Sequence, residues 1–164
     1  METPRDSSAG DGALAISVES PLAEDLTLIF QRHWAEMQAD TPPESMHAMP
    51  RGTLVSPEIA FFVMRIDGQP VAMGALKRLD ADHSEIKSMH VMAEHRGRGL
   101  SRVLLDHLIR HARQQGMSRV SLETGAQPSF SAARALYERA GFLQCPPFGS
   151  YREDPHSVYM TAAL

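Results

Sequence analysis

The hydrophobic residues in the middle of the chain lose the helical period that they follow on either side of it. Residues 59–66 (IAFFVMRI) and 69–79 (QPVAMGALKRL) are rich in β-branched and aromatic side chains, which favour strands. Asp67-Gly68 between them is a strong hairpin signal. A third strand is expected at 85–92 (EIKSMHVM), so the middle of the chain predicts three consecutive strands.

Three segments have the apolar spacing of helices. The first is expected to start at Pro21 and to run to residue 38, and its buried stripe is formed by Leu22, Leu26, Ile29, Phe30 and Trp34. The second ends at Gly116, and its apolar side is formed by Leu100, Val103, Leu104, Leu108, Ile109 and Ala112. The third is expected at 131–140. Residues 39–52 contain three prolines and predict no regular helix beyond a single turn at 43–45.

Short strands are expected at 14–18, 118–124, 142–145 and 156–164. The strand at 118–124 follows a helical crossover, so it should lie parallel to the strand at 85–92. The element order predicts an α+β fold with a mixed, mostly antiparallel sheet of six to seven strands, a central parallel pair and helices on both faces. Residues 1–12 are polar and predict a disordered tail, and residues 13–164 predict a single domain.

Composition narrows the function classes. The 164 residues carry a net charge of −4 with a pI near 6.0, which argues against a general nucleic-acid binder. The one cysteine, Cys145, excludes an internal disulfide. There is neither a signal-peptide pattern nor an apolar run of the roughly 20 residues that a membrane span needs. We therefore expect a soluble, cytoplasmic protein without a membrane partner.

A basic, glycine-rich loop stands between the third strand and the second helix. Gly97 and Gly99 permit unusual backbone dihedrals, and Arg96 and Arg98 add positive charge where the helix N-terminus already favours an anion. The spacing is neither that of a Walker A loop nor GxGxxG. The pattern favours an anion on the first turn of the helix, and the alternative is a flexible, solvated loop.

Two motifs resemble those of the GNAT superfamily of N-acetyltransferases. Arg96–Ser101 resembles the (Q/R)-x-x-G-x-(G/A) motif, with Ser101 at its last, small position. LYERAGF at 136–142 is similar to the L-Y-x-x-x-G-F signature, with Ala133 at the usual small position and Phe130 where the family often has Asn. More narrowly, the segments at 42–49, 85–89, 121–125 and 145–160 resemble the YsnE-like acetyltransferases.

The resemblance implies the GNAT fold and an acetyl-CoA-dependent N-acetyltransferase without a metal, in which an amine attacks the thioester directly. It also implies homodimerisation as a common state of the family. The residues that it implies for acetyl-CoA binding are Met89, His90, Val91, Arg96, Gly97, Arg98, Gly99, Leu100, Ser101, Ala133 and Tyr137.

The resemblance also implies the catalytic groups. Tyr137 is the expected acid for the leaving thiolate, since an ordinary tyrosine is protonated at neutral pH. Glu85, eleven residues before Arg96, is the first candidate for the general base. An equal alternative for Glu85 is an ion pair with Lys87 on the same strand face. His90 is a competing base, but strict alternation places it on the opposite face from Glu85, and His47 is a third candidate.

The acetyl acceptor is the least determined part of this interpretation. Two segments flank the expected cofactor slot, and their candidate acceptor-binding residues are Glu44, His47, Tyr151 and Asp154. Acidic and aromatic groups there suit a small cationic amine or an amino-acid-like acceptor. The alternatives are protein or peptide N-acetylation and a CoA-binding sensor with little turnover.

A histidine pair on the second helix has the spacing of metal ligands. His107 and His111 are four residues apart, but neither a third ligand nor an HExxH glutamate accompanies them. A solvated helix face is the favoured interpretation, and no metal is expected.

Overall fold

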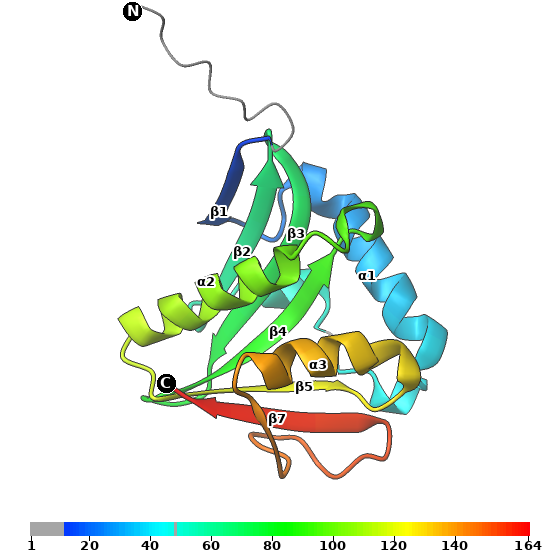
Figure 1. Ribbon diagram of the computed structural model, residues 1–164, viewed down its shortest axis with the longest axis vertical. Coiled ribbons are helices and arrows are strands. Elements are labelled where there is room, and N and C mark those ends of the chain that lie inside the picture. Colours follow the sequence, from blue (N-terminus) through cyan, green and yellow to red (C-terminus); the bar gives the residue numbers. More distant parts are fainter. Residues whose placement is uncertain (1–11, 48) are drawn as a thin grey trace, which may run out of the picture.

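One open, mixed sheet runs through the computed structural model, which describes residues 12–47 and 49–164 (Figure 1). The strand order is β1-β2-β3-β4-β5-β7-β6, and only β4 and β5 pair in parallel. The strands are β1 (Leu14–Val18), β2 (Ile59–Ile66), β3 (Gln69–Arg78), β4 (His83–Val91), β5 (Arg119–Gly125), β6 (Leu143–Cys145) and β7 (Ser157–Ala163). This confirms the predicted mixed sheet with its parallel pair. The predicted tail, except for Gly12, lies outside the described residues.

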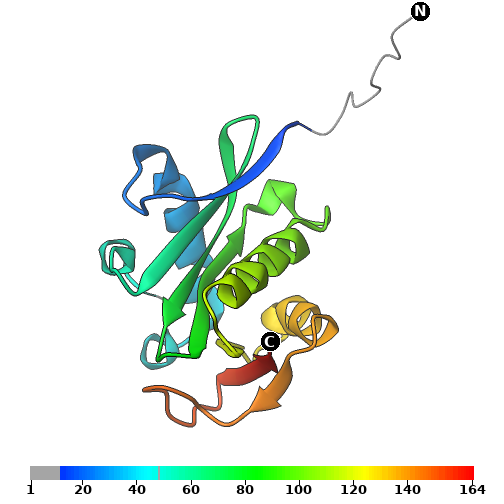
Figure 2. The same ribbon diagram turned by 90° about the vertical axis from the view of Figure 1, so that its left-hand side faces the viewer.

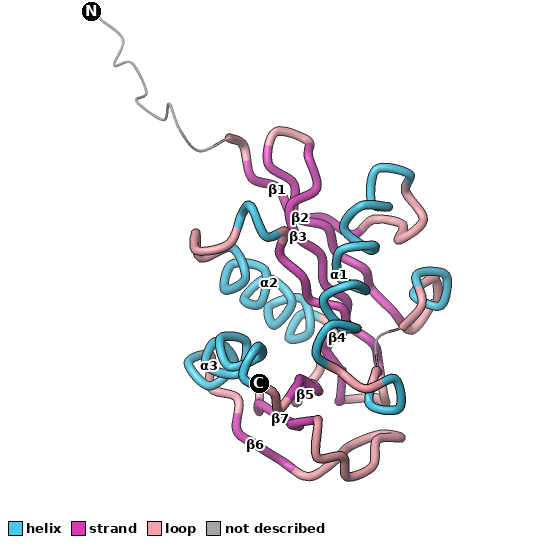
Figure 3. The backbone as a smooth tube through the Cα atoms, turned by 90° about the vertical axis from the view of Figure 1, so that its right-hand side faces the viewer, coloured by secondary structure: helices cyan, strands magenta, loops and turns pink. Residues whose placement is uncertain are grey.

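Helices cover both faces of the sheet, as predicted. Helix α1 (Thr27–Asp40) lies on one face, and α2 (Leu100–Gln114) and α3 (Ser131–Arg139) lie on the other (Figures 2 and 3). Each face has its own core. Leu26 and Ile29 pack with the α1-facing strand residues, whereas Leu104 and Leu108 of α2 pack on the opposite face, and all four are almost fully buried.

The first helix begins later than the sequence predicts. Residues 21–26 form a turn and the short 3-10 helix Glu24–Leu26, and α1 begins at Thr27. Arg51 helps to hold this segment, because its guanidinium donates hydrogen bonds to the carbonyls of Pro21 and Ala23, and the Leu26 N–H closes a 3-10 turn on Ala23.

Three residues of the predicted apolar stripes are exposed. The exposed fractions are 56% for Leu22, 42% for Trp34 and 43% for Val103. Leu22 lies outside the helix, and Trp34 stands five residues after Ile29, which rotates it far from the buried side of α1. The side of α1 that faces the sheet continues instead through His33 and Met37. Both residues line a cavity, so this end of the helix does not pack into the apolar core.

A β-bulge in β4 overturns the expectation that His90 and Glu85 lie on opposite faces. On β3, Met73 and Ala75 are two residues apart, but their partners His90 and Lys87 are three apart. Ser88 takes up the extra residue with a left-handed φ of 56°. The bulge reverses the alternation, so Glu85, Lys87 and His90 all face α1 and line the same cavity.

The same bulge explains the glycine inside β3. Gly74 lies opposite it, and a Cβ there would stand 3.1 Å from Leu108 Cδ1 and 3.3 Å from Met89 Cγ. The sequence predicted a bulge or a close approach at Gly74, and the structure confirms the close approach.

The parallel pair opens into a cleft. β4 and β5 are paired from His83–Arg119 to Ile86–Leu122, and no further pair joins them within the described chain. Beyond that point β4 stays with β3 up to Val91, whereas β5 stays with β7 up to Gly125. The backbone edges of both strands therefore face a common gap.

Candidate active site

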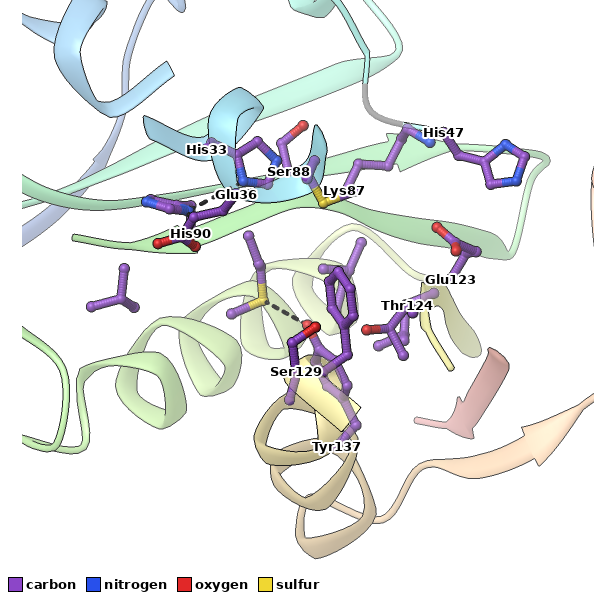
Figure 4. Close-up of a pocket in the computed structure, with 18 of the residues that line it drawn as sticks. His33, Glu36, His47, Lys87, Ser88, His90, Glu123, Thr124, Ser129 and Tyr137 are labelled. Atoms are coloured by element: carbon purple, nitrogen blue, oxygen red, sulfur yellow. Dashed lines mark hydrogen bonds and ion pairs between the residues drawn. The ribbon is translucent and has the colours of Figure 1, made fainter. Parts of the chain in front are cut away.

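A cavity of about 500 Å³ occupies the place where β4 and β5 separate. Its walls come from both strands, from the inner side of α1, from α3 and from the segments around His47 and Tyr151. Figure 4 shows His33, Glu36 and His90 at one end, His47 and Glu123 at the other, and Tyr137 rising between them from α3. This volume is typical of small-molecule sites.

The cavity gathers a large part of the residues expected to bind the cofactor. Six of them line it: Met89, His90, Val91, Arg96, Ala133 and Tyr137. The free backbone edge of β4 in this gap can accept an extended chain in the manner of an added strand. Phe130, which stands where the GNAT motif often has Asn, also lines the cavity and covers Gly125, where a Cβ would lie 2.2 Å from the ring.

The glycine loop follows β4 and leads into α2. Gly97 and Gly99 have left-handed φ values of 77° and 75°, and Gly99 is the N-cap of α2 without a side-chain cap. The first-turn N–H groups, which begin at Leu100 and Ser101, are therefore left for another acceptor. A Cβ on either glycine would meet nothing within 4 Å, so the loop is open to a ligand. This backbone geometry fits a pyrophosphate.

The two arginines of the loop have protein partners. Arg96 donates to both carboxylate oxygens of Glu36 at 2.8 Å and to the carbonyl of Val91 at 2.9 Å. Arg98 contacts Nδ1 of His95 at 3.1 Å. Arg96 thus ties the loop to α1 and to the end of β4, and its charge is shared with Glu36.

A substitution in the loop tests its role. Ala at Gly99 would force a side chain into a left-handed conformation that costs about 1–2 kcal/mol. If the loop binds acetyl-CoA, as the resemblance to the GNAT motif implies, Gly99→Ala should raise the KM for acetyl-CoA about tenfold with a smaller change in kcat. Steady-state kinetics measure this change. Gly68→Ala is the matched control, because Gly68 has a φ of 79° in the distant β2–β3 hairpin. An equal rise of KM in both variants would contradict the assignment.

Tyr137 points into the cavity from α3. Its residue is 7% exposed, and its hydroxyl lies 3.8 Å from the thioether sulfur of Met89, which is bulged toward it from β4. Burial, with a smaller contribution from Glu123, raises the pKa of Tyr137 to about 12. The hydroxyl therefore stays protonated at neutral pH and can donate a proton or a hydrogen bond.

Glu85 is buried in an ion pair, as the alternative interpretation predicted. Lys87 Nζ lies 3.1 Å from Glu85 Oε2 and 2.8 Å from the hydroxyl oxygen of Tyr151. The Tyr151 hydroxyl also donates to Glu85 Oε2 at 2.5 Å. Burial, followed by the nearby charge of Glu85, raises the pKa of Tyr151 far above its ordinary value. One oxygen of Glu85 thus receives two donors inside a closed triad.

Glu123 is a carboxyl group that the sequence interpretation missed. It stands two residues after Ser121, the parallel partner of Glu85, and lines the cavity from β5. Burial raises the pKa of Glu123 to about 7, more than the nearby Lys87 lowers it. The available signal was its position at the carboxyl end of a strand that belongs to a parallel pair. Its burial depends on the separation of the strands, which the sequence does not show.

Two histidines meet at the other end of the cavity. Nδ1 of His33 on α1 and Nδ1 of His90 on β4 are 3.2 Å apart. Burial lowers the pKa of each to about 4, so both are neutral at pH 7. His90 Nε2 is buried and has no hydrogen-bond partner among the described residues. His33 was not singled out from the sequence either, because it lies between Phe30 and Trp34 in a helix for which only a buried apolar stripe was predicted.

The four predicted acceptor residues divide into two groups. His47 and Tyr151 line the cavity, with their rings edge to face at 5.1 Å. Asp154 stands behind His47, with Oδ2 3.9 Å from His47 Nε2. The pKa of Asp154 is lowered, first by the His156 N–H and then by the Ser45 hydroxyl. Glu44 lies on the 3-10 helix Pro43–Ser45, is exposed and is not part of the cavity wall.

The histidine pair of α2 lies away from the cavity. The rings of His107 and His111 contact the edge of Phe62 at centroid distances of 5.4 and 4.9 Å. Residues 12–47 and 49–164 contain no group of three or more His, Cys, Asp or Glu side chains that could hold a metal ion. Within the same residues, no helix has the length and hydropathy to cross a membrane.

Comparison with known proteins agrees with this geometry. The family model described as "Acetyltransferase (GNAT) family" matches residues 24–142. The chain is 41% identical over 149 residues to the uncharacterized N-acetyltransferase YsnE of Bacillus subtilis, with 91% of this chain and 99% of YsnE covered. It is 35% identical over 153 residues to an IAA acetyltransferase of Azospirillum brasilense, with 92% and 98% covered.

A solved structure has the same fold. The putative acyl-CoA N-acyltransferase of Klebsiella pneumoniae superposes with a TM-score of 0.72 at 27% identity, with 92% of this chain and 97% of that chain covered.

Proposed function

Because this chain belongs to the GNAT family of acetyltransferases, we propose that it transfers an acetyl group from acetyl-CoA to the amine of a small acceptor. GNAT enzymes use acetyl-CoA, which supplies the activated thioester. The observation that carries the proposal is the cleft between β4 and β5, which brings Arg96, at the start of the glycine loop, into one cavity with the partly buried carboxyl group of Glu123 and the buried phenol of Tyr137. A cofactor slot and two groups able to move protons thus share one cavity.

The cofactor is held by main-chain groups. The left-handed glycines and the uncapped N-terminus of α2 offer N–H groups to the pyrophosphate, and the free edge of β4 at Met89 and Val91 offers hydrogen bonds to an extended arm. Ala133 on α3 gives room for this arm because its side chain is small. These groups orient the thioester before the amine arrives.

Glu123 is the general base in this proposal, in place of Glu85. A base with a pKa near the working pH combines a populated basic form with a useful affinity for the proton, and burial gives Glu123 a pKa of about 7. Glu85 instead receives hydrogen bonds from Lys87 and Tyr151 on one oxygen, which fixes the floor of the cavity beside Glu123. His90 and His47 remain further proton acceptors in the same cavity.

Tyr137 is the acid that serves the leaving sulfur. Its hydroxyl stays protonated at neutral pH, and α3 directs it toward the bulged segment of β4. A protonated donor near the developing thiolate lowers the barrier to its departure. Base and acid therefore lie on β5 and α3, on either side of the free edge of β4.

An acetyl-CoA assay over a panel of amines tests the proposed function. We expect amine-dependent release of CoA, detected as free thiol, together with an acetylated product in mass spectrometry. IAA, which the name of the Azospirillum relative contains, is assayed separately beside the amines. Saturable CoA binding without amine-dependent CoA release for any acceptor would contradict the proposal and favour a CoA-binding sensor.

A further inference from the structure

More carboxyl groups than cationic side chains line the cavity. Among the described lining residues, the cations that are charged at every physiological pH are Lys87 and Arg96. The carboxyl groups are Glu36, Asp40, Glu85 and Glu123. A charged substrate must find its partner within this set or remain exposed to solvent.

Both cations already hold a carboxylate. Lys87 lies 3.1 Å from Glu85 and 2.8 Å from the Tyr151 hydroxyl, and its side chain is only 11% exposed. Arg96 holds both oxygens of Glu36 at 2.8 Å. Taking Lys87 for a substrate carboxylate would leave Glu85, whose side chain is 5% exposed, without its partner, and an unpaired buried carboxylate is costly. Glu36 is 49% exposed, so its pair with Arg96 is weaker, but it lies at the far end of the cavity from Glu123 (Figure 4).

The histidines of the cavity do not offer a further unpaired positive charge to a substrate carboxylate. Burial keeps His33 and His90 neutral at pH 7, and their Nδ1 atoms are directed at each other. His47 stands 3.9 Å from the carboxylate of Asp154, so a positive charge on His47 would already have a partner. Among the described residues, no ion pair is formed by Glu123 or Asp40, although the charge of Lys87 lies near Glu123.

We infer that the acceptor is an amine without a carboxylate on the carbon that bears the amine, and that free α-amino acids are rejected. This inference rests on the proposed function. In an α-amino acid one carbon joins the ammonium and carboxylate groups, so an amine delivered to Glu123 brings its carboxylate next to Glu123 and to the Glu85–Lys87 pair. The like charges repel, and each cation is occupied. A cationic amine or an amidated amino acid meets only the attraction of the acids.

Matched acceptors test the inference by removing only the carboxylate charge. The sets are tyramine, tyrosine and tyrosinamide; agmatine, arginine and argininamide; isobutylamine, valine and valinamide. We expect the kcat/KM of the amine and of the amide to exceed that of the acid at least tenfold in each set that reacts. Acids that react as well as their amides would overturn the inference and leave the proposed function intact. Amine-dependent CoA release that is absent throughout would contradict both.

A variant that frees a cation gives a second test. Glu85→Gln leaves Lys87 without its carboxylate, so we expect the ratio of kcat/KM for the acid to that for its amide to rise about tenfold within this variant. The matched control is Glu94→Gln, which removes the same charge from an exposed ion pair with Arg32 outside the cavity. An unchanged ratio in Glu85→Gln, or an equal change in Glu94→Gln, would count against the role of the occupied lysine.

Discussion

Glu123→Gln is expected to lower kcat/KM for a reactive amine about 10²-fold, because glutamine keeps the size of the side chain and cannot accept the proton. The pH profile should change as well. Since burial raises the pKa of Glu123 to about 7, the wild-type rate should fall about tenfold per pH unit below pH 7 as this base is protonated. The ionisation of the amine affects both proteins equally. The ratio of wild-type to variant rates with one amine therefore shows the acidic limb of the pH profile that is due to Glu123 alone.

Glu85→Gln is the comparison that distinguishes the two carboxyl groups. If Glu123 is the base, the acidic limb near pH 7 persists in Glu85→Gln and disappears only in Glu123→Gln. Loss of that limb in Glu85→Gln alone would reassign the base to Glu85. The triad with Lys87 and Tyr151 predicts that Glu85→Gln mainly weakens acceptor binding, visible as a higher KM.

Folding stability gives a readout of the same pKa without turnover. The pKa of Glu123 is raised from 4.5 to about 7, so its carboxyl group favours the folded state below pH 4.5, and this contribution is lost as the pH rises through 7. The shift corresponds to roughly 3 kcal/mol. Denaturant unfolding at pH 5 and pH 8 should therefore show the stability of wild type falling relative to Glu123→Gln. A constant difference between the two proteins would mean that the pKa is not raised.

The conformation of the glycine loop and the place of Tyr137 in the cavity could be predicted from the sequence because their signals are local, whereas the binding of acetyl-CoA there stays a prediction. Gly97 and Gly99 indicate a left-handed backbone conformation, and Tyr137 lies in a short motif on one helix. The sheet and its parallel pair followed from periodicity and the handedness of the crossover, which also depend on neighbouring residues.

The rest of the cavity could not be predicted in the same way, because it depends on contacts between distant segments. Ser88 gives no sequence signal for the bulge that turns His90 to the face of Glu85. Glu123 acquires its high pKa first from burial in the gap between β4 and β5 and then from the nearby charges of Glu85 and Asp154. His33 becomes a cavity residue because α1 packs on β4, and Arg51 fixes where the segment before α1 turns.

Tyr137→Phe is expected to lower kcat about 10²-fold, while the KM for acetyl-CoA changes less than about threefold. In the proposed mechanism the phenol hydroxyl acts on the leaving sulfur, whereas the ring, which phenylalanine keeps, lines the cavity. The substitution should hardly affect folding, because the hydrogen-bond partner of this hydroxyl among the described residues is the weakly accepting Met89 sulfur at 3.8 Å. A loss of turnover at unchanged stability is therefore a loss of chemistry.

Tyr159→Phe is the matched control for this prediction. Tyr159 is also buried, and its hydroxyl donates to the carbonyl of Arg152 at 2.6 Å, so its removal should cost stability of about 1 kcal/mol and leave kcat nearly unchanged. Steady-state kinetics and urea unfolding of both variants separate the two effects. If Tyr137→Phe keeps wild-type kcat at every pH, the leaving thiolate departs without this acid, and the bulge in β4 and α3 serve cofactor binding alone.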